Sequence, residues 1–290
     1  MAGQARAAVW IAVSEGSADY ATVAEEIRAG LGRGDAQTEV SIRPWAEVAQ
    51  GIPPQVRLLV SVGSPAYTGL VEAAAAGRLG RTPLVATLLP RAVFEAQRRK
   101  LAGTVTGIVL DQPAVRQMAL LRYAFPHLRR VGILLGPDSE ASQAALEKAA
   151  AEQGLQANVY KVQADADLYP ALRRVIEEND LLLAIPDTTV YNGASIQNIL
   201  LASYRQKTPL IGFSPAYVRA GAMLALYSTP AQIGSQTTRA ARNLLAGTPV
   251  PVVQTPTDFV VSANVNVARS LGFRLSEEAL RLQLLSREGL

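Results

Sequence analysis

The same series of apolar runs and helical stretches occurs twice along this chain. VWIAVSEGSADY is matched by VGILLGPDSEAS, LLVSVGSPAY by LLLAIPDTTV, and RTPLVATLL by KTPLIGFSP. The three matches keep one order and a nearly constant separation, which pairs Val9 with Val131, Ser64 with Asp187, and Pro83 with Pro209. Such a repeat indicates two similar lobes in tandem. The chain has 290 residues, enough for two ordinary domains.

Each repeated unit alternates an apolar run of strand length with a helical pattern, as in AAVWIAV followed by ADYATVAEEIRAGL. This alternation predicts an α/β fold with parallel sheets that are covered by helices on both faces. Nearly continuous apolar strands such as VRLLVSV agree with burial on both faces of a sheet.

A third segment follows the two repeats. GAMLALYS is predicted to be a strand, STPAQIGSQTTRAARNLLAG a helix that begins at Ser228 or Thr229, and FVVSANVNVARSLGF a strand followed by a helix. These units must complete both sheets, so we expect the chain to cross between the lobes more than once. We predict an N-terminal lobe of residues 1–112 and 222–252, and a C-terminal lobe of residues 113–221 and 253–290.

Composition excludes several kinds of chemistry. The chain has no cysteine and one histidine, His127, which removes thiol nucleophiles, disulfides and most zinc and triad chemistry. The aspartates show no calcium-loop spacing, so we expect no metal and no cofactor. The net charge of +4 comes from scattered basic residues, and we expect no nucleic-acid partner.

Two features of the sequence concern membranes and export. No apolar run reaches the roughly 20 residues that a membrane-spanning helix needs. The first residues, MAGQARAAVWIAV, lack the charged, apolar and cleavage-site regions of a signal peptide. We therefore expect either a cytoplasmic chain or one whose export signal has been removed.

Polar residues follow the predicted strand ends of both lobes. In open α/β sheets, ligands bind outside the carboxyl ends of the strands. If the two lobes face each other by those ends, the strand-end residues line a single cleft. The first lobe offers Ser14, Glu15, Gly63, Ser64 and Thr87, and the second offers Gly136, Asp138, Asp187, Thr188 and Ser214.

The apolar run LLLAIP ends at Asp187, and a buried carboxylate is unfavourable unless it is paired or lies at a wet opening. Asp187 is therefore either the N-cap of the next helix or a ligand contact. Ser64, which precedes Pro65, is predicted to cap a helix, and so is Asp138 together with Ser139. Two caps that face one cleft would also direct helix N-termini toward an anionic group of a ligand.

Aromatic and acidic residues near the strand ends have two interpretations as well. Tyr67, Tyr191 and Tyr217 could form a wall for a planar or apolar ligand, or they could pack helices against a sheet. Glu15 could contact ligand or be solvated. An enzyme would use Asp187 as a base, but the sequence has no nucleophile, metal pair, phosphate loop or acid partner for it. We expect no catalysis.

Several stretches resemble one protein family. They are TGIVLDQP with RQMALLRYAFPHLRRVGILLGPDS, then TPLIGFSPAYVRAGAMLALYSTPAQIG, then LLAGTPVPVVQTPTDFVVSANVNVARSLG. These stretches are similar to solute-binding proteins of ABC transporters, in the family that includes tryptophan- and tyrosine-binding lipoproteins. The order of elements resembles the type I periplasmic binding proteins, and the resemblance covers most of residues 58–273. It implies two Rossmann-like lobes joined by three crossovers.

The resemblance also implies a function. Such a receptor captures a small polar solute, an amino acid or an aromatic compound among the candidates, and delivers it to an ABC permease in the inner membrane. The family's ligand loops match Gly63, Ser64, Thr87 and Asp187. Ser214 stands where related proteins often have an acidic residue, so a second negative group for an ammonium is missing.

The resemblance implies a location in the periplasm or an anchor at the outer face of a membrane, and we expect a monomer. The alternative is a ligand-sensing domain of a signalling or regulatory system without transport, because repressors reuse this fold. Too few residues precede AAVWIAV for a helix-turn-helix, which favours the receptor.

Overall fold

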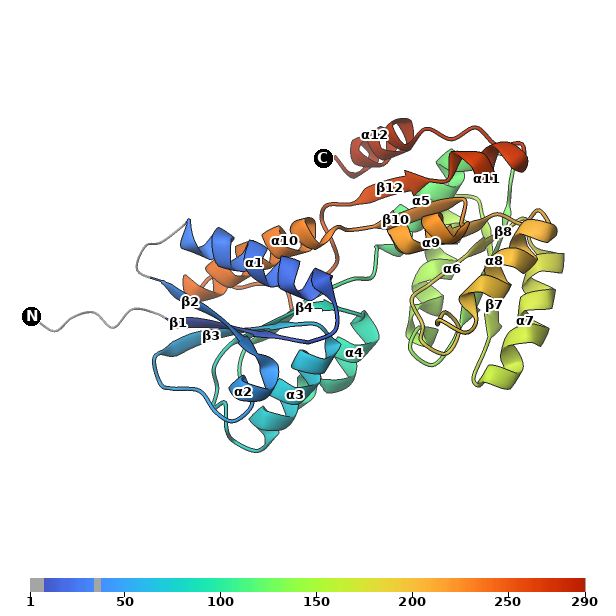
Figure 1. Ribbon diagram of the computed structural model, residues 1–290. Helices are drawn as coiled ribbons and strands as arrows, with labels where there is room; N and C mark the ends of the chain where they lie inside the picture. The colour runs from blue at the N-terminus through green and yellow to red at the C-terminus, as the bar shows by residue number, and fades with distance from the viewer. Residues whose placement is uncertain (1–7, 34–37, 290) are drawn as a thin grey trace, which may run out of the picture. The chain divides into compact units, whose positions relative to one another are not determined.

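The structure is a computed structural model that describes residues 8–33 and 38–289 (Figure 1). Its strands form two six-stranded sheets, with the orders β11-β5-β4-β3-β1-β2 and β12-β10-β9-β8-β6-β7. The pairs are parallel except for β10 with β12, which is antiparallel. The two orders correspond strand by strand, β1 with β6 and β3 with β8, so the predicted repeat and the α/β fold are confirmed.

The first compact unit consists of Met1–Asp111 and Ser228–Asp258. Its strands are β1 (Ala8–Val13), β2 (Glu39–Pro44), β3 (Val56–Val62), β4 (Leu84–Leu89), β5 (Val105–Val109) and β11 (Val253–Gln254). Its helices are α1 (Ala18–Gly32), α2 (Trp45–Val48), α3 (Ser64–Ala75), α4 (Arg91–Gln97), η1 (Arg98–Lys100) and α10 (Pro230–Leu245).

The second compact unit consists of Gln112–Tyr227 and Phe259–Leu290. Its strands are β6 (Arg130–Leu135), β7 (Gln156–Lys161), β8 (Leu181–Leu183), β9 (Leu210–Gly212), β10 (Leu224–Tyr227) and β12 (Val260–Ala263). Its helices are α5 (Ala114–Ala124), η2 (Glu140–Ser142), α6 (Gln143–Glu152), α7 (Asp165–Glu178), α8 (Ile196–Arg205), α9 (Pro215–Ala220), α11 (Val265–Ser270) and α12 (Glu277–Glu288).

Each unit has apolar clusters on both faces of its sheet. Successive strand residues point to opposite faces. In β3, Leu58 and Val60 therefore pack with residues of α1 and α10, whereas Leu59 packs on the other face with residues of α3. In the second unit, Ile133 of β6 belongs to the cluster that contains residues of α5 and α12, and Leu134 to the cluster with residues of α7 and α8. The continuous apolar strands thus reflect burial on both faces.

The chain passes between the two units three times, after Asp111, Tyr227 and Asp258. The boundaries expected at residues 222 and 252 fall too early. β10 pairs with β9 and β12, so it belongs to the second sheet and the return to the first unit comes at Ser228. β11 pairs with β5, which extends the first unit past residue 252.

The helix that returns to the first unit follows its sequence closely. Thr229 is the N-cap of α10, and its side chain accepts a hydrogen bond from the Gln232 backbone N–H while Gln232 reaches back to the Thr229 N–H. Pro230 occupies the first turn, where its missing N–H is not needed. Gly247, with φ of 72°, follows the helix end. These end signals confirm the predicted helix.

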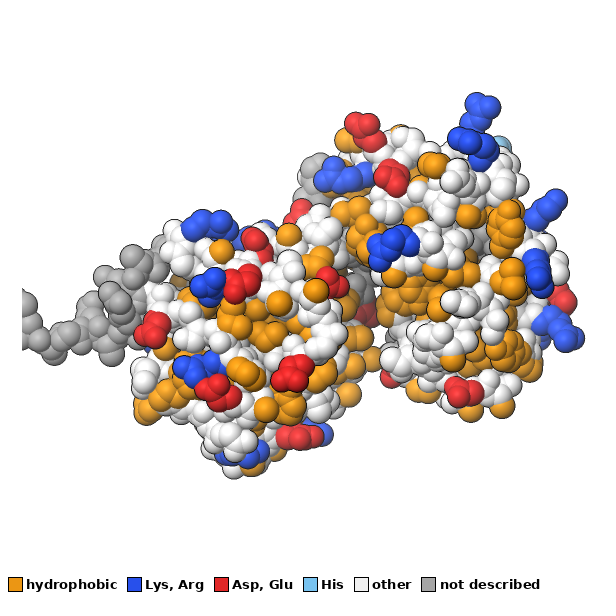
Figure 2. All heavy atoms as spheres, viewed as in Figure 1, with side chains coloured by type: hydrophobic (Ala, Val, Ile, Leu, Met, Phe, Trp, Pro, Cys, Tyr) orange, Lys and Arg blue, Asp and Glu red, His pale blue; other side chains and the backbone are white. Residues whose placement is uncertain are grey.

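Among the described residues, no helix is both long and apolar enough to cross a membrane. On the face that Figure 2 shows, Lys and Arg side chains are spread over the surface of each unit among Asp, Glu and uncharged side chains.

Candidate functional site

In the first unit, the ends of β1 and β3 bring Ser14, Gly63 and Ser64 together. Gly63 has φ of 91°, and a Cβ atom there would lie 2.7 Å from Ser14 Oγ. Ser14 Oγ accepts a hydrogen bond of 2.9 Å from the backbone N–H of Ala66 in the first turn of α3. The hydroxyl of Ser14 therefore serves the start of α3, and Gly63 allows the close approach of the two strand ends.

Ser64 is not the cap that the sequence predicts. Gly63 is the N-cap of α3, and Ser64 is the first helical residue, followed by Pro65. The half-buried hydroxyl of Ser64 has no hydrogen-bond partner within residues 8–33 and 38–289. It lies at the start of a 12-residue helix, where the backbone N–H groups and the helix dipole favour a hydrogen-bond acceptor or an anion.

The other two predicted residues of this unit differ in exposure. Thr87 is fully buried, and its Oγ1 lies 2.8 Å from Thr237 Oγ1 of α10. Its carbonyl accepts the N–H of Gly63 at 2.9 Å, so Thr87 holds the sheet and α10 together. Glu15 is exposed beside Gly16 and has no hydrogen-bond partner in the described part of the chain. A solute contact by either residue stays a prediction. The exposed Glu15 is better placed for such a contact than the buried Thr87.

In the second unit, Asp187 is buried at 5% exposure and fully hydrogen-bonded. Its Oδ2 accepts from the backbone N–H and the hydroxyl of Ser139, at 2.9 and 2.8 Å. Its Oδ1 accepts from the backbone N–H groups of Thr189 and Val190, at 3.0 and 3.3 Å. Asp187 thus caps a turn and not a helix, because the next helix, α8, begins only at Ile196. The prediction of a helix N-cap is wrong in this respect.

A second carboxylate ties the same two loops together. Asp138 Oδ2 accepts from the backbone N–H and the hydroxyl of Thr188, at 3.2 and 2.5 Å. Asp138 and Ser139 do not cap α6, which begins at Gln143 with Ser142 as its N-cap. The loops after β6 and β8 are therefore joined by two carboxylates.

Gly136, at the end of β6, lies against the carboxylate of Asp187. A Cβ atom at Gly136 would lie 2.3 Å from Asp187 Oδ1. Only glycine leaves room for the carboxylate there. The strand-end glycine that the sequence offers as a site residue thus serves the placement of Asp187.

Three aromatic rings lie together at the ends of β8 and β9. Tyr191 makes edge-on contacts with Phe213 and Tyr217, with ring centroids 5.9 and 6.3 Å apart, and Phe213 and Tyr217 are 4.5 Å apart. The Tyr191 hydroxyl is buried and has no hydrogen-bond partner among the described residues. Burial, followed by the nearby Tyr217 and Asp187, raises the pKa of Tyr191 well above its usual range. Burial likewise raises the pKa of Tyr217.

Two further predicted residues have clear places. Ser214 is the N-cap residue of α9, but its half-buried side chain makes no capping hydrogen bond. Tyr67 lies in the core of the first unit, stacked on Phe94 and donating its hydroxyl proton to the Phe94 carbonyl at 3.1 Å. Tyr67 is thus a packing residue and cannot form the wall of a site.

Sequence reasoning missed Phe213 and Thr237, and it gave Ser139 the role of a helix cap and not that of a partner of Asp187. Ser139 supplies two of the four donors to Asp187, Phe213 completes the aromatic cluster, and Thr237 partners Thr87. Ser139 and Phe213 each follow a strand end, which is a usable signal. Nothing local marks Thr237, because it meets Thr87 only through the return of the chain to the first unit.

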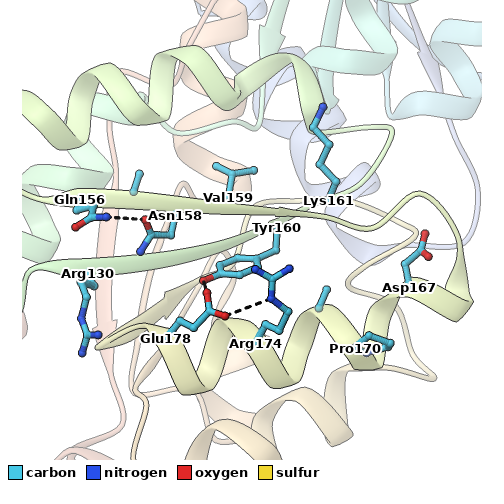
Figure 3. Close-up of a pocket in the computed structure, with 12 residues that line it drawn as sticks. Arg130, Gln156, Asn158, Val159, Tyr160, Lys161, Asp167, Pro170, Arg174 and Glu178 are labelled. Atoms are coloured by element: carbon cyan, nitrogen blue, oxygen red, sulfur yellow. Dashed lines mark hydrogen bonds and ion pairs between the residues drawn. The ribbon is translucent and has the colours of Figure 1, made fainter.

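A cavity of about 780 Å³ lies elsewhere in the second unit, along the edge strand β7 and helix α7 (Figure 3). The Tyr160 hydroxyl donates to Glu178 at 2.7 Å and accepts from Asn179 at 2.9 Å, while Arg174 pairs with Glu178 at 3.2 Å. The hydrogen bond from Tyr160, then that from Arg174, lowers the pKa of Glu178. These polar groups satisfy one another, and none of the predicted site residues lines this cavity.

This is a two-unit α/β protein with polar residues at corresponding strand ends of both units and an aromatic cluster at the strand ends of the second. A family model described as "ABC transporter substrate binding protein" matches residues 45–283. The chain belongs to this family, whose members bind solutes for ABC transport systems. Substrate-binding proteins of ABC importers are extracellular or periplasmic, and they take a small-molecule ligand and an ABC permease as partners.

Similar solved structures show the same fold. A conserved domain protein from Vibrio cholerae is 22% identical, with a TM-score of 0.65, and the match covers 96% of this chain and 98% of that one. An ABC domain from Streptococcus pneumonia in complex with L-Trp is 19% identical, with a TM-score of 0.62 and coverage of 94% and 96%.

A third structure is a ligand-free, open substrate-binding protein with adhesive properties from Clostridium difficile. It is 16% identical, with a TM-score of 0.67 and coverage of 93% and 95%. The predicted type I periplasmic binding architecture is thereby confirmed. The comparison with curated proteins found no relative.

Proposed function

We propose that this chain is the receptor of an ABC import system that binds a small solute and delivers it to a permease, without catalysis. The observation that carries this proposal is the hydroxyl of Ser64, which lies at the start of α3 and has no hydrogen-bond partner among the described residues. Helix starts of this kind hold anionic or acceptor groups of ligands. Ser214 supplies a comparable hydroxyl at a strand end of the second unit, with no partner among the described residues.

The aromatic cluster of the second unit supports a solute with a planar or apolar part. Tyr191 and Tyr217 combine ring surface with hydroxyl groups, and the Tyr191 hydroxyl has a proton that no described residue accepts. The relative that is described in complex with L-Trp agrees with an aromatic solute.

The carboxylates bear on whether the solute carries an ammonium group. Both oxygens of Asp187 are already occupied by donors of its own unit, and Asp138 is paired with Thr188. Glu15 is exposed and uncommitted, so in our proposal it holds the ammonium if the solute is an amino acid. We further propose a periplasmic or outer-face location, in keeping with the family.

Denaturing the purified protein should release any bound solute, whose mass can then be measured by mass spectrometry. Thermal unfolding in the presence of L-tryptophan, L-tyrosine, indole or D-allose should identify the chemical class of the solute. A solute that binds only the native state raises the melting temperature. We expect Ser64→Ala to weaken binding about tenfold. Ser41→Ala, on the edge strand β2, is the matched control and should leave binding unchanged. Steady conversion of a solute to a product would contradict the proposal of a receptor without catalysis.

A further inference from the structure

A cavity of about 210 Å³ lies between α1 and α10 of the first unit, and three of its seven lining residues are arginines. Arg33 follows the end of α1, and Arg239 and Arg242 lie on one face of α10. Among the described residues of the lining, Glu26 is the one other charged residue, and Ser235 adds a hydroxyl. None of these residues belongs to the candidate solute site.

Two glycines bring the helices close enough to form this cavity. A Cβ atom at Gly30 would lie 2.7 Å from Thr238 Oγ1, and one at Gly234 would lie 2.8 Å from Glu26 Cβ. Positions 26 and 30 thus face positions 234 and 238, so the two helices run in the same direction, side by side in Figure 1. Their last turns therefore present arginines to the same space.

Two carboxylates lie within ion-pair distance of these guanidinium groups but accept no hydrogen bond from them. Glu26 lies 3.8 Å from Arg33, and Asp258 lies 3.9 Å from Arg239, both beyond hydrogen-bonding range. Elsewhere in the described chain, arginines that pair with acids do so closely, as in Arg116 with Glu288 at 2.6 Å. The charges of Arg33 and Arg239 are therefore partly compensated, but neither carboxylate takes up a guanidinium hydrogen bond.

Most donors of the three guanidinium groups have no hydrogen-bond acceptor within the described residues. Each group has five N–H donors. Arg242 donates to the Gly30 carbonyl, which satisfies a backbone group at the end of α1. Arg239 donates to Thr257 at 3.0 Å and reaches Ser235 at 3.5 Å. Helix capping thus explains Arg242 but neither Arg33 nor Arg239.

We propose that this cavity binds a phosphate group, supplied by inorganic phosphate or by the phosphomonoester headgroup of a membrane lipid. Guanidinium groups form charge-assisted hydrogen bonds with phosphate oxygens in a fixed planar geometry, and several of them around one space suit a tetrahedral dianion. The Ser235 hydroxyl adds a neutral donor. This site is independent of solute binding at the strand ends.

Calorimetric titration of the full chain with inorganic phosphate at low, constant ionic strength tests the proposal. We expect saturable binding that Arg239→Gln and Arg33→Gln each weaken about tenfold. Arg28→Gln is the matched control, because Arg28 is exposed on the same helix α1, pairs with Glu25 at 2.5 Å and carries the same charge. It should change the dissociation constant less than about twofold. Circular dichroism verifies that each variant is folded.

Vesicles separate the two sources of phosphate. Co-sedimentation with phosphatidic acid vesicles, lost in Arg239→Gln and kept in Arg28→Gln, assigns the site to a lipid headgroup. Binding of inorganic phosphate without vesicle binding assigns it to the free ion. The proposal is overturned if neither probe binds, or if Arg239→Gln and Arg28→Gln weaken binding equally, since the effect would then be one of net charge.

Discussion

Asp187 shows how a single buried charge is accommodated at a strand end. Its carboxylate is buried in the loop after β8, where an unpaired charge would be strongly unfavourable. Four donors from Ser139, Thr189 and Val190 supply the missing solvation. The same contacts fix the positions of the loops after β6 and β8, which carry other candidate solute contacts.

We expect Asp187→Ala to lower the free energy of unfolding by about 1–3 kcal/mol, because it leaves buried N–H groups without acceptors. Urea unfolding followed by circular dichroism measures this. Asp138→Ala, which removes a more exposed carboxylate, should have a smaller effect. If Asp187→Ala left stability unchanged but weakened solute binding, the structural role would be wrong and a direct contact between Asp187 and the solute would be favoured.

At the scale of elements, Asp180 joins the starts of two neighbouring strands. It immediately precedes β8, and its Oδ2 accepts the backbone N–H groups of Arg129 and Arg130, at 2.9 and 2.8 Å. The Arg130 guanidinium lies 2.7 Å from the other carboxylate oxygen. Partial burial alone would raise the pKa of Asp180, but the hydrogen bonds from Arg130 and Arg129 outweigh it and hold that pKa below its usual value.

This pKa shift gives a pH dependence with a definite sign. Because the pKa of Asp180 is lower in the folded than in the unfolded chain, its contribution to stability is present above pH about 4 and is lost as the pH falls through the folded pKa. We expect Asp180→Asn to lower the free energy of unfolding by about 1–2 kcal/mol at pH 7.

The difference from the wild type should shrink as the pH falls below about 4 and through the folded pKa of Asp180. Urea unfolding between these pH values measures it, with Glu152→Gln, an exposed carboxylate of α6, as the control. A deficit in Asp180→Asn that is equal at both ends of the range would mean that lost packing, and not lost charge, causes it.

The sequence predicts the ends of a helix well where the residues that cap it are close to each other along the chain. The ends of α10 follow from Thr229, Pro230 and Gly247, because capping bonds join residues that are close in sequence. The roles of Ser64 and Asp187 could not be read in this way. The acceptor for the first turn of α3 is Ser14, which comes from another strand, and two donors to Asp187 come from Ser139. Such contacts exist only after the strands are assembled.

At the scale of the whole molecule, the third segment of the chain completes both units. α10 supplies Ile233 to the apolar cluster of the first unit, whereas α12 supplies Leu284 to a cluster of the second. The repeat in the sequence predicts two lobes and more than one crossing. It cannot give the crossing points, because β10 and β11 reveal their sheets only by their partners.

Because α10 packs in the first unit and α12 in the second, a substitution in either helix should destabilise mainly its own unit. Ile233 and Leu284 are fully buried, so Ile233→Ala and Leu284→Ala should each lower stability by about 2–5 kcal/mol. Hydrogen exchange read by mass spectrometry should show faster exchange mainly in β1 and β3 for Ile233→Ala, and mainly in β6 and α5 for Leu284→Ala. Each variant serves as the control for the other, since the sites are equally buried and lie in one continuous segment. Loss of protection in the same unit for both would mean that residues 228–290 form a single structural extension, and the division at Asp258 would be wrong.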